Sequence, residues 1–118
     1  SDNMTYYYTP SEIPAKYASI GNQTVRIMGV VKADSVKWVP KSTKLSFQLT
    51  DEQSYELNVE YTGAKPDMFR EGQGVVVEGK LSDTQSLVAN ALLVKHNEDY
   101  SATDHKKQKE DYTKSLQQ

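Results

Sequence analysis

Residues 44–61 read KLSFQLTDEQSYELNVEY, in which two runs of alternating apolar and polar side chains flank the polar triplet at residues 51–53. Alternation places successive side chains on opposite faces of a β-strand, and a short polar link between two such runs is typical of a hairpin. The segment therefore predicts two antiparallel strands, residues 44–50 and 54–61, that share one apolar face. The side chains expected on that face are Leu45, Phe47, Leu49, Tyr55, Leu57 and Val59.

Other segments with strand character surround the hairpin. Residues 24–31 alternate and are rich in branched side chains, residues 75–81 begin with consecutive valines, and residues 86–94 become apolar toward their end. Gly29 lies inside the first of these segments and predicts a bulge or a coil where a small barrel bends. Residues 36–39 add a short extended piece, so the sequence predicts five strands and a short sixth.

Two short helical turns are expected. Residues 9–12, TPSE, have the form of a capping box with proline at the first helical position, and Pro14 is expected to keep this turn short. Residues 66–70, PDMFR, predict a second turn that Gly72 ends. The tyrosines at residues 6–8 are expected to pack against the strands, because a free terminus would not keep so many aromatic rings in water.

Five strands with a helical turn between the third and the fourth are the order of an OB-fold. We therefore expect an all-β domain, a small five- to six-stranded OB-fold barrel, in residues 21–96. Residues 1–20 are expected to pack on it as an aromatic N-terminal segment. Residues 97–118 have almost nothing to bury and are expected to form a mobile C-terminal tail, in which His105 is a surface residue.

The composition excludes several classes of function. The chain has 118 residues, 36% of them apolar, which is enough for one domain with a modest core. It has no cysteine, which excludes disulfides, thiolate metal sites and cysteine nucleophiles. No nucleophile with its base is recognisable and two histidines are too few for a catalytic metal cluster, so we do not expect an enzyme. The net charge of -2 also argues against a nucleic-acid partner.

The end of the last strand has an unusual pattern. Residues 92–94 carry apolar side chains on both faces, and His96 follows, with Tyr100 four residues further on. Apolar surface beside a histidine can mark a binding site. A histidine or a tyrosine at a strand end is, by itself, more often a solvated surface residue.

Three blocks of the sequence resemble the CcmE family, the haem chaperones of cytochrome c maturation. They are residues 95–100, KHNEDY, which resemble the family's His-x-x-x-Tyr segment, residues 8–13, YTPSEI, and residues 66–79, PDMFREGQGVVVEG. A single His-x-x-x-Tyr would carry no weight. The three blocks occur in the family's order, so the resemblance covers most of the chain.

The resemblance implies that His96 forms a transient covalent bond to a vinyl group of b-type haem, and that Tyr100 is an axial ligand of the iron. A neutral imidazole is nucleophilic, and a deprotonated phenol is a hard oxygen donor suited to ferric iron. Four fully extended steps from His96 to Tyr100 would span ~13 Å, whereas one helical turn would bring the two to ~6 Å. The segment is therefore expected to turn when haem binds.

A porphyrin also needs a flat apolar platform. The resemblance points to Phe69, Leu93 and Tyr7 as platform candidates, although Phe69 fits equally well as a core residue. Lys95 or Arg70 could pair with a haem propionate, although a charge beside a barrel is more often simply solvated.

The family's setting implies the partners. They are haem, apocytochrome c, and the membrane proteins that load haem onto the chaperone and ligate it to the cytochrome, on the periplasmic side of the bacterial inner membrane. The family is tethered there by an N-terminal helix. No apolar run here approaches the roughly 20 residues of a membrane span, and the chain opens at Ser1. We therefore expect an excised, monomeric, soluble domain without that anchor.

The alternative function is an OB-fold module that binds single-stranded nucleic acid or oligosaccharide. Such barrels bind strands with aromatic side chains and a basic groove. Tyrosines and a tryptophan are present, but Glu and Asp are scattered along the same strands, so the groove is not obviously basic.

Overall fold

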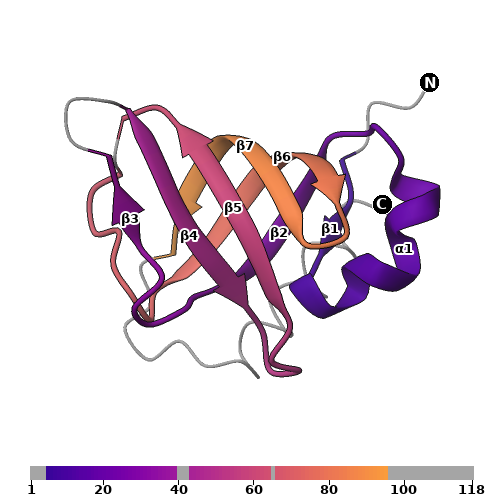
Figure 1. The fold of residues 1–118 in the computed structure, drawn as a ribbon, viewed down its shortest axis with the longest axis horizontal. Coiled ribbons are helices and arrows are strands. Elements are labelled where there is room, and N and C mark those ends of the chain that lie inside the picture. Colours follow the sequence, from indigo (N-terminus) through magenta and orange to yellow (C-terminus); the bar gives the residue numbers. More distant parts are fainter. Residues whose placement is uncertain (1–4, 40–42, 65, 96–118) are drawn as a thin grey trace.

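The computed structural model describes residues 5–39, 43–64 and 66–95, and strands dominate them (Figure 1). The strands are β1 (Tyr7–Tyr8), β2 (Val25–Val31), β3 (Lys37–Trp38), β4 (Lys44–Thr50), β5 (Glu56–Thr62), β6 (Gly74–Asp83) and β7 (Ser86–Val94). A 3-10 helix, Pro10–Glu12, leads directly into the α-helix α1 (Ile13–Ile20).

The strands form one sheet that closes on itself. Its order is β1-β2-β6-β7-β5-β4-β3, and β4 also pairs with β2, which joins the five long strands into a ring. The strands β4 and β5 are the predicted hairpin, with Leu45 opposite Tyr61 and Leu49 opposite Leu57. The five strands expected from the sequence are thus confirmed as β2 and β4 to β7, and the short sixth as β3. The two-residue strand β1 was not expected.

The apolar face predicted for the hairpin lines the core of this ring. Each of its strand residues, from Leu45 to Val59, has at most 2% of its surface exposed. Tyr55 was wrongly included, because it precedes β5 and is only half-buried. Its hydroxyl donates a hydrogen bond of 2.5 Å to the carbonyl of Thr84. A phenol needs such a partner when it is partly buried, and the edge of the ring provides one.

Gly29 does not form the bulge that the sequence suggested. It pairs in register with Val75 of β6. A Cβ at this position would lie 2.6 Å from Cγ of Leu49 and 2.8 Å from the carbonyl oxygen of Thr50. The glycine is needed because β4 approaches β2 closely where the two strands close the ring.

The bulge lies instead on β7. Ala89 is opposite Gly79 and Ala91 is opposite Glu78, so Asn90 is an extra residue between them. One inserted residue reverses the alternation beyond it. The core side of β7 therefore changes from odd-numbered to even-numbered residues, and Leu93 points outward.

The N-terminal helical segment begins as expected but runs further. The backbone N–H of Thr9 donates to Oε1 of Glu12 at 2.8 Å, which is the glutamate half of the capping box. The expectation that Pro14 would end the segment was wrong. Proline lacks a backbone N–H, but Pro14 lies in the first turn of α1, where that N–H has no acceptor within the helix. Ile13 and Ile20 of α1 belong to the core, and the helix closes one end of the ring (Figure 1).

The tyrosines before this helix are attached to the ring by the main chain. Tyr7 and Tyr8 pair in parallel with Arg26 and the next residue of β2, and the N–H of Arg26 donates to the carbonyl of Tyr6 at 2.9 Å. Tyr8 packs against the core. Its burial, together with the nearby Glu12 and Tyr6, raises the pKa of its hydroxyl.

The opposite end of the ring is crossed by residues 66–73, which form turns. The helical turn expected over residues 66–70 was wrong. Met68 has φ of 69°, in the left-handed region that interrupts a helix. Phe69 is 7% exposed and packs edge-on against Phe47, with ring centroids 5.0 Å apart, so its side chain fills the core at this end of the ring.

None of the helices in the described ranges is both long and apolar enough to cross a bilayer. The tail predicted to be mobile, residues 97–118, lies outside the described residues, as does His105 within it.

Candidate functional site

The backbone at the exit of β7 is held in place as far as Lys95. Its N–H donates to the carbonyl of Gly74 at 2.8 Å, and its own carbonyl accepts a hydrogen bond from Nε2 of Gln73. Gln73 is 8% exposed, and it is the only polar side chain among the described residues that is buried. His96 and Tyr100 lie outside the described residues, but these bonds hold the backbone of Lys95, which precedes His96 in the sequence.

We expect Gln73→Ala to lower the free energy of unfolding by about 1–2 kcal/mol, because it leaves the carbonyl of Lys95 without its buried donor. Amide hydrogen exchange should show a matching loss of protection at the N–H of Lys95. Gln53→Ala, in the exposed turn between β4 and β5, is the control and should change neither quantity. Unaltered protection of Lys95 in Gln73→Ala would mean that Gln73 does not hold the exit.

An apolar row crosses the outer face of the sheet beside this exit. Met28 of β2 pairs with Val76 of β6, which pairs with Leu93 of β7. The strand neighbours Ile27 and Val77 belong to the core, so the row points away from it. Met28 and Val76 are 0% and 8% exposed, whereas Leu93 is 59% exposed. Leu93 is therefore the part of the row that is open to a ligand.

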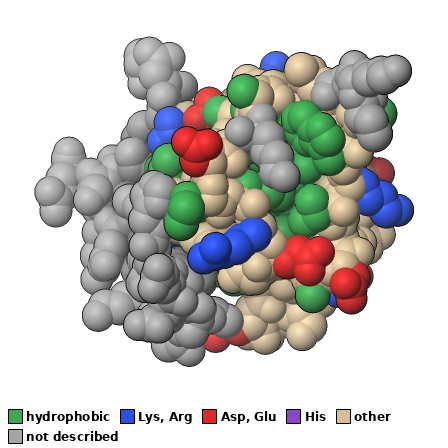
Figure 2. All heavy atoms as spheres, turned by 90° about the vertical axis from the view of Figure 1, so that its left-hand side faces the viewer, with side chains coloured by type: hydrophobic (Ala, Val, Ile, Leu, Met, Phe, Trp, Pro, Cys, Tyr) green, Lys and Arg blue, Asp and Glu red, His purple; other side chains and the backbone are tan. Residues whose placement is uncertain are grey.

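Further apolar side chains are exposed at this end of the ring. They are Trp38 and Val39, at the end of β3, and Met68, in the turn that crosses this end. We call these three residues and Leu93 the exit patch, in which β4 and β5 lie between the strand of Trp38 and that of Leu93. Figure 2 faces this end of the molecule and shows hydrophobic side chains gathered right of its centre, with charged side chains below and to the right of them. Apolar surface with a charged border is typical of a binding site.

The structure separates the residues proposed as the haem platform. Leu93 is exposed in the exit patch, whereas Phe69 lies in the core, as its alternative interpretation had it. The hydroxyl of Tyr7 accepts a hydrogen bond of 3.0 Å from Nη1 of Arg26, on β2. Arg70 is exposed in the turn after Phe69.

A polar cluster beside the apolar row was not foreseen. Nε of Arg26 donates to Oε1 of Glu78 at 2.7 Å, and the guanidinium lies 5.4 Å from the ring centroid of Tyr7. The hydrogen bond to Glu78 raises the pKa of Arg26. Arg26 and Glu78 lie two residues from Met28 and Val76 along their strands, so a charged pair borders the row. In the sequence, Arg26 and Glu78 are recognisable only as polar positions of two alternating segments. Alternation does not reveal that these two segments become neighbouring strands.

A groove of about 590 Å³ lies on another face of the ring, across β3, β4, β5 and the first half of β7. Strand register arranges its floor in two rows, each of which crosses the strands. The first row is Lys37, Ser46, Glu60 and Val88, and the second is Gln48, Asn58 and Ser86, with Ser35 beside it. Sequence reasoning did not identify this groove, although the polar side of the hairpin contributes four of its residues.

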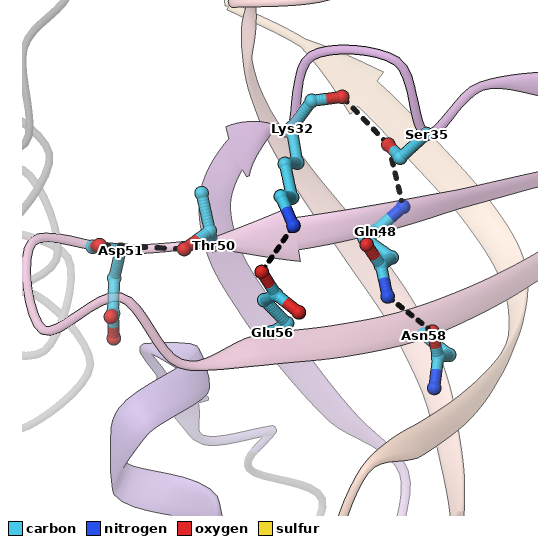
Figure 3. A network of polar contacts seen from close by, with 7 residues as sticks. All are labelled: Lys32, Ser35, Gln48, Thr50, Asp51, Glu56 and Asn58. Carbon is cyan, nitrogen blue, oxygen red and sulfur yellow. Dashed lines mark hydrogen bonds and ion pairs between the residues drawn. The ribbon is translucent and has the colours of Figure 1, made fainter.

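Side-chain hydrogen bonds order the second row (Figure 3). Nε2 of Gln48 donates to Oδ1 of Asn58 at 3.0 Å, and Oγ of Ser35 accepts from the N–H of Gln48 at 3.0 Å. Lys32, just after β2, and Glu56, at the start of β5, form an ion pair beside this row. In this part of the groove, Ser35, Gln48 and Asn58 are therefore held relative to one another by hydrogen bonds.

The CcmE domain family matches residues 4–103 of the chain. The cytochrome c-type biogenesis proteins CcmE of Aeromonas hydrophila and Halorhodospira halophila are each 41% identical to it, over 105 and 99 residues. These alignments cover 85% and 84% of the chain but 64% and 65% of the relatives. The chain thus spans about two thirds of the length of the curated relatives it matches.

The fold is similar to that of solved structures. The solution NMR structure of the OB-fold domain of the heme chaperone CcmE from Desulfovibrio vulgaris has a TM-score of 0.56 and 33% identity, and covers 62% of this chain and 86% of that one. The telomere capping protein Ten1 from Saccharomyces pombe has a TM-score of 0.63, with 94% of this chain and 99% of that one covered, but its 12% identity shows the fold alone. With the family match over residues 4–103 and the closed ring of OB-fold strands, the chain belongs to the CcmE family.

Proposed function

We propose that this domain is a haem chaperone, which binds haem covalently through His96 for a limited time and delivers it to apocytochrome c. The observation that supports this proposal is the exit of β7. Two hydrogen bonds hold Lys95, and Leu93 exposes 59% of its surface just before it. A residue at position 96 would therefore leave the ring beside apolar surface, where a porphyrin can bind.

The covalent step adds the imidazole N–H of His96 across the C=C bond of a vinyl group on b-type haem. A nitrogen–carbon bond forms, the double bond becomes single, and the proton goes to the other vinyl carbon. No electron is gained or lost, so the reverse elimination restores the vinyl group when the haem leaves. Imidazole is suited to this step because much of it is neutral near pH 7 and keeps a nucleophilic nitrogen.

We propose Tyr100 as the axial ligand of the haem iron. A tyrosine oxygen is an established haem ligand in proteins and favours the ferric state. Since four residues separate Tyr100 from His96, a turn that brings them to ~6 Å would let one residue reach the rim of the porphyrin and the other its iron. Asn97, Glu98 and Asp99 between them are polar and suit a segment that bends in water.

The exit patch is the proposed platform, with Leu93 in direct contact with the porphyrin. Phe69 would support the patch from the core, through the turn that carries the exposed Met68. Tyr7 would contribute through its cluster with Arg26, beside the apolar row. Lys95 and Arg70 each lie two residues in the sequence from a member of the patch, Leu93 and Met68, and would meet the propionates. A platform at the surface leaves much of the haem exposed, which suits a carrier that must release it.

The cellular setting follows from the family. The matched relatives are named cytochrome c-type biogenesis proteins. We propose that the domain works on the periplasmic side of the bacterial inner membrane, held there by an N-terminal helix. Its partners would be the membrane proteins that load haem onto it and the ligase that transfers haem to apocytochrome c, and the domain itself would be a monomer.

The platform can be tested with a matched pair of substitutions on β7. Leu93→Asp should weaken haem binding about tenfold, because removing one exposed leucine from an apolar contact costs about 1.4 kcal/mol or more. Val88→Asp is the control, since Val88 is 56% exposed on the same strand but lies in the groove. It should leave haem affinity unchanged. Absorbance titrations of the two variants with haem measure the difference, and equal affinities would rule out Leu93 as the platform.

A further inference from the structure

We propose that the groove across β3, β4, β5 and β7 binds an extended polypeptide segment, as a second binding surface separate from the exit patch. The inference rests on the proposed function only for the choice of apocytochrome c as the first polypeptide to test. Its support is the shape, the hydrogen-bonding groups and the charges of the groove.

The dimensions of the groove fit a short length of chain. Its volume of about 590 Å³ lies within the roughly 300–1,000 Å³ of ligand sites. From β3 to β7 it crosses three strand spacings, or about 14 Å, which is about four residues of extended chain. In OB-folds the face of the second and third strands, with the loops beside it, is where ligands bind. Those strands are β4 and β5 here, so the groove lies on that face.

The hydrogen-bonding groups of the floor match a peptide backbone. An extended chain presents both N–H donors and C=O acceptors. Gln48 and Asn58 each supply donors and an acceptor, and after their mutual hydrogen bond Gln48 keeps its carbonyl oxygen while Asn58 keeps its amide. The hydroxyls of Ser46 and Ser86 can donate or accept. The row can therefore bond to both kinds of backbone group.

The charges and rings of the groove disfavour the other ligands of OB-folds. Lys37 and Asp34 lie at one side of the groove. Glu60 lies two strands away, and its Oε1 is 3.5 Å from Nζ of Lys44. This mixture gives no excess of positive charge for a phosphate backbone. The one aromatic side chain among the lining residues, Phe47, is 2% exposed, so no ring is available to stack on a base. A polypeptide with both charges and an apolar side chain over Val88, which is 56% exposed, complements the groove.

The two binding surfaces lie at different places on one strand. Val88 and Leu93 both point outward, five residues or about 16 Å apart along β7. A polypeptide in the groove would therefore leave Leu93 and the exit of β7 accessible.

The test uses the 118-residue chain, free of haem and labelled with ¹⁵N, and compares its NMR spectra with three probes. The probes are unfolded apocytochrome c, a single-stranded oligothymidylate and a malto-oligosaccharide. We expect apocytochrome c to shift the amide signals of Ser46, Gln48, Asn58 and Glu60, and the other two probes to leave them in place. Shifts at these residues with the oligonucleotide or the saccharide would overturn the polypeptide assignment, as would apocytochrome c shifts confined to the exit patch.

Substitutions then separate this inference from the haem proposal. The double variant Gln48→Ala, Asn58→Ala and the single variant Val88→Asp should each weaken binding of apocytochrome c by at least about fivefold, the effect expected when a contact central to an interface is lost. Leu93→Asp, which should impair haem binding, should leave this affinity unchanged. An equal effect of Leu93→Asp and Val88→Asp on apocytochrome c would overturn the groove, whether or not haem still attaches to His96.

Discussion

His96→Ala should abolish the haem that remains attached after denaturation. In the wild-type domain, haem added under reducing conditions is expected to stay with the unfolded chain, because it is held by a nitrogen–carbon bond and not by contacts that unfolding destroys. Alanine has no nucleophile, so only haem bound through the exit patch would remain, and denaturation would release it. The measurement is the haem absorbance of the protein band after denaturing electrophoresis.

The second histidine provides the control. His105 is the other imidazole of the chain, and His105→Ala should retain attached haem as the wild type does. Tyr100→Phe should also retain it, since it removes only the phenol oxygen, but the spectrum of the bound iron should change because the axial ligand is lost. Attachment that persists in His96→Ala, or that disappears in His105→Ala instead, would contradict the assignment of His96.

Gly79→Ala should destabilise the domain by about 3 kcal/mol or more, a large part of the typical stability of a small domain. A Cβ at this position would lie 2.0 Å from the carbonyl oxygen of Val88 and 2.8 Å from Cα of Ala89. Both atoms belong to the backbone of β7, so no side-chain rotation can relieve the clash, and the strands must separate where the β7 bulge lies. The free energy of unfolding from circular dichroism in urea measures the loss.

Lys80→Ala is the matched control for this substitution. Lys80 is the next residue of β6 and is exposed, so its truncation should change stability by less than about 0.5 kcal/mol. A stability of Gly79→Ala close to that of Lys80→Ala would show that β6 and β7 can shift apart at little cost.

The parts of the fold that could be predicted from the sequence are those that depend on local pattern. The hairpin of β4 and β5 was recognised because its alternation and its polar link lie within 18 consecutive residues, 44–61. The helical turn expected at residues 66–70 was wrong because Met68 takes a left-handed backbone conformation, and of the bulge or coil expected at Gly29 no bulge forms there. A glycine can serve a bulge or the close approach of another strand, and only the position of β4 decides between these.

The site could be predicted only where a single segment carries it. The exit of β7 was identified from residues 92–94, which are apolar on both faces. The groups that surround it come from distant segments, since Gln73 is 22 residues from Lys95 and Arg26 is 52 residues from Glu78. Alternation does not say which strands become neighbours, so neither contact could be inferred. The roles of His96 and Tyr100 came from the resemblance to the family and stay predictions.

The extra residue at Asn90 has a consequence for comparisons within the family. Val88 and Leu93 are an odd number of positions apart, so on a regular strand they would face opposite ways, and only the irregular spacing of β7 turns both toward the outside. A relative shortened by one position between Ala89 and Leu93 would direct that leucine inward even if every other amino acid were retained. The length of this interval is therefore a better guide than side-chain identity to which homologues keep the surface beside the histidine.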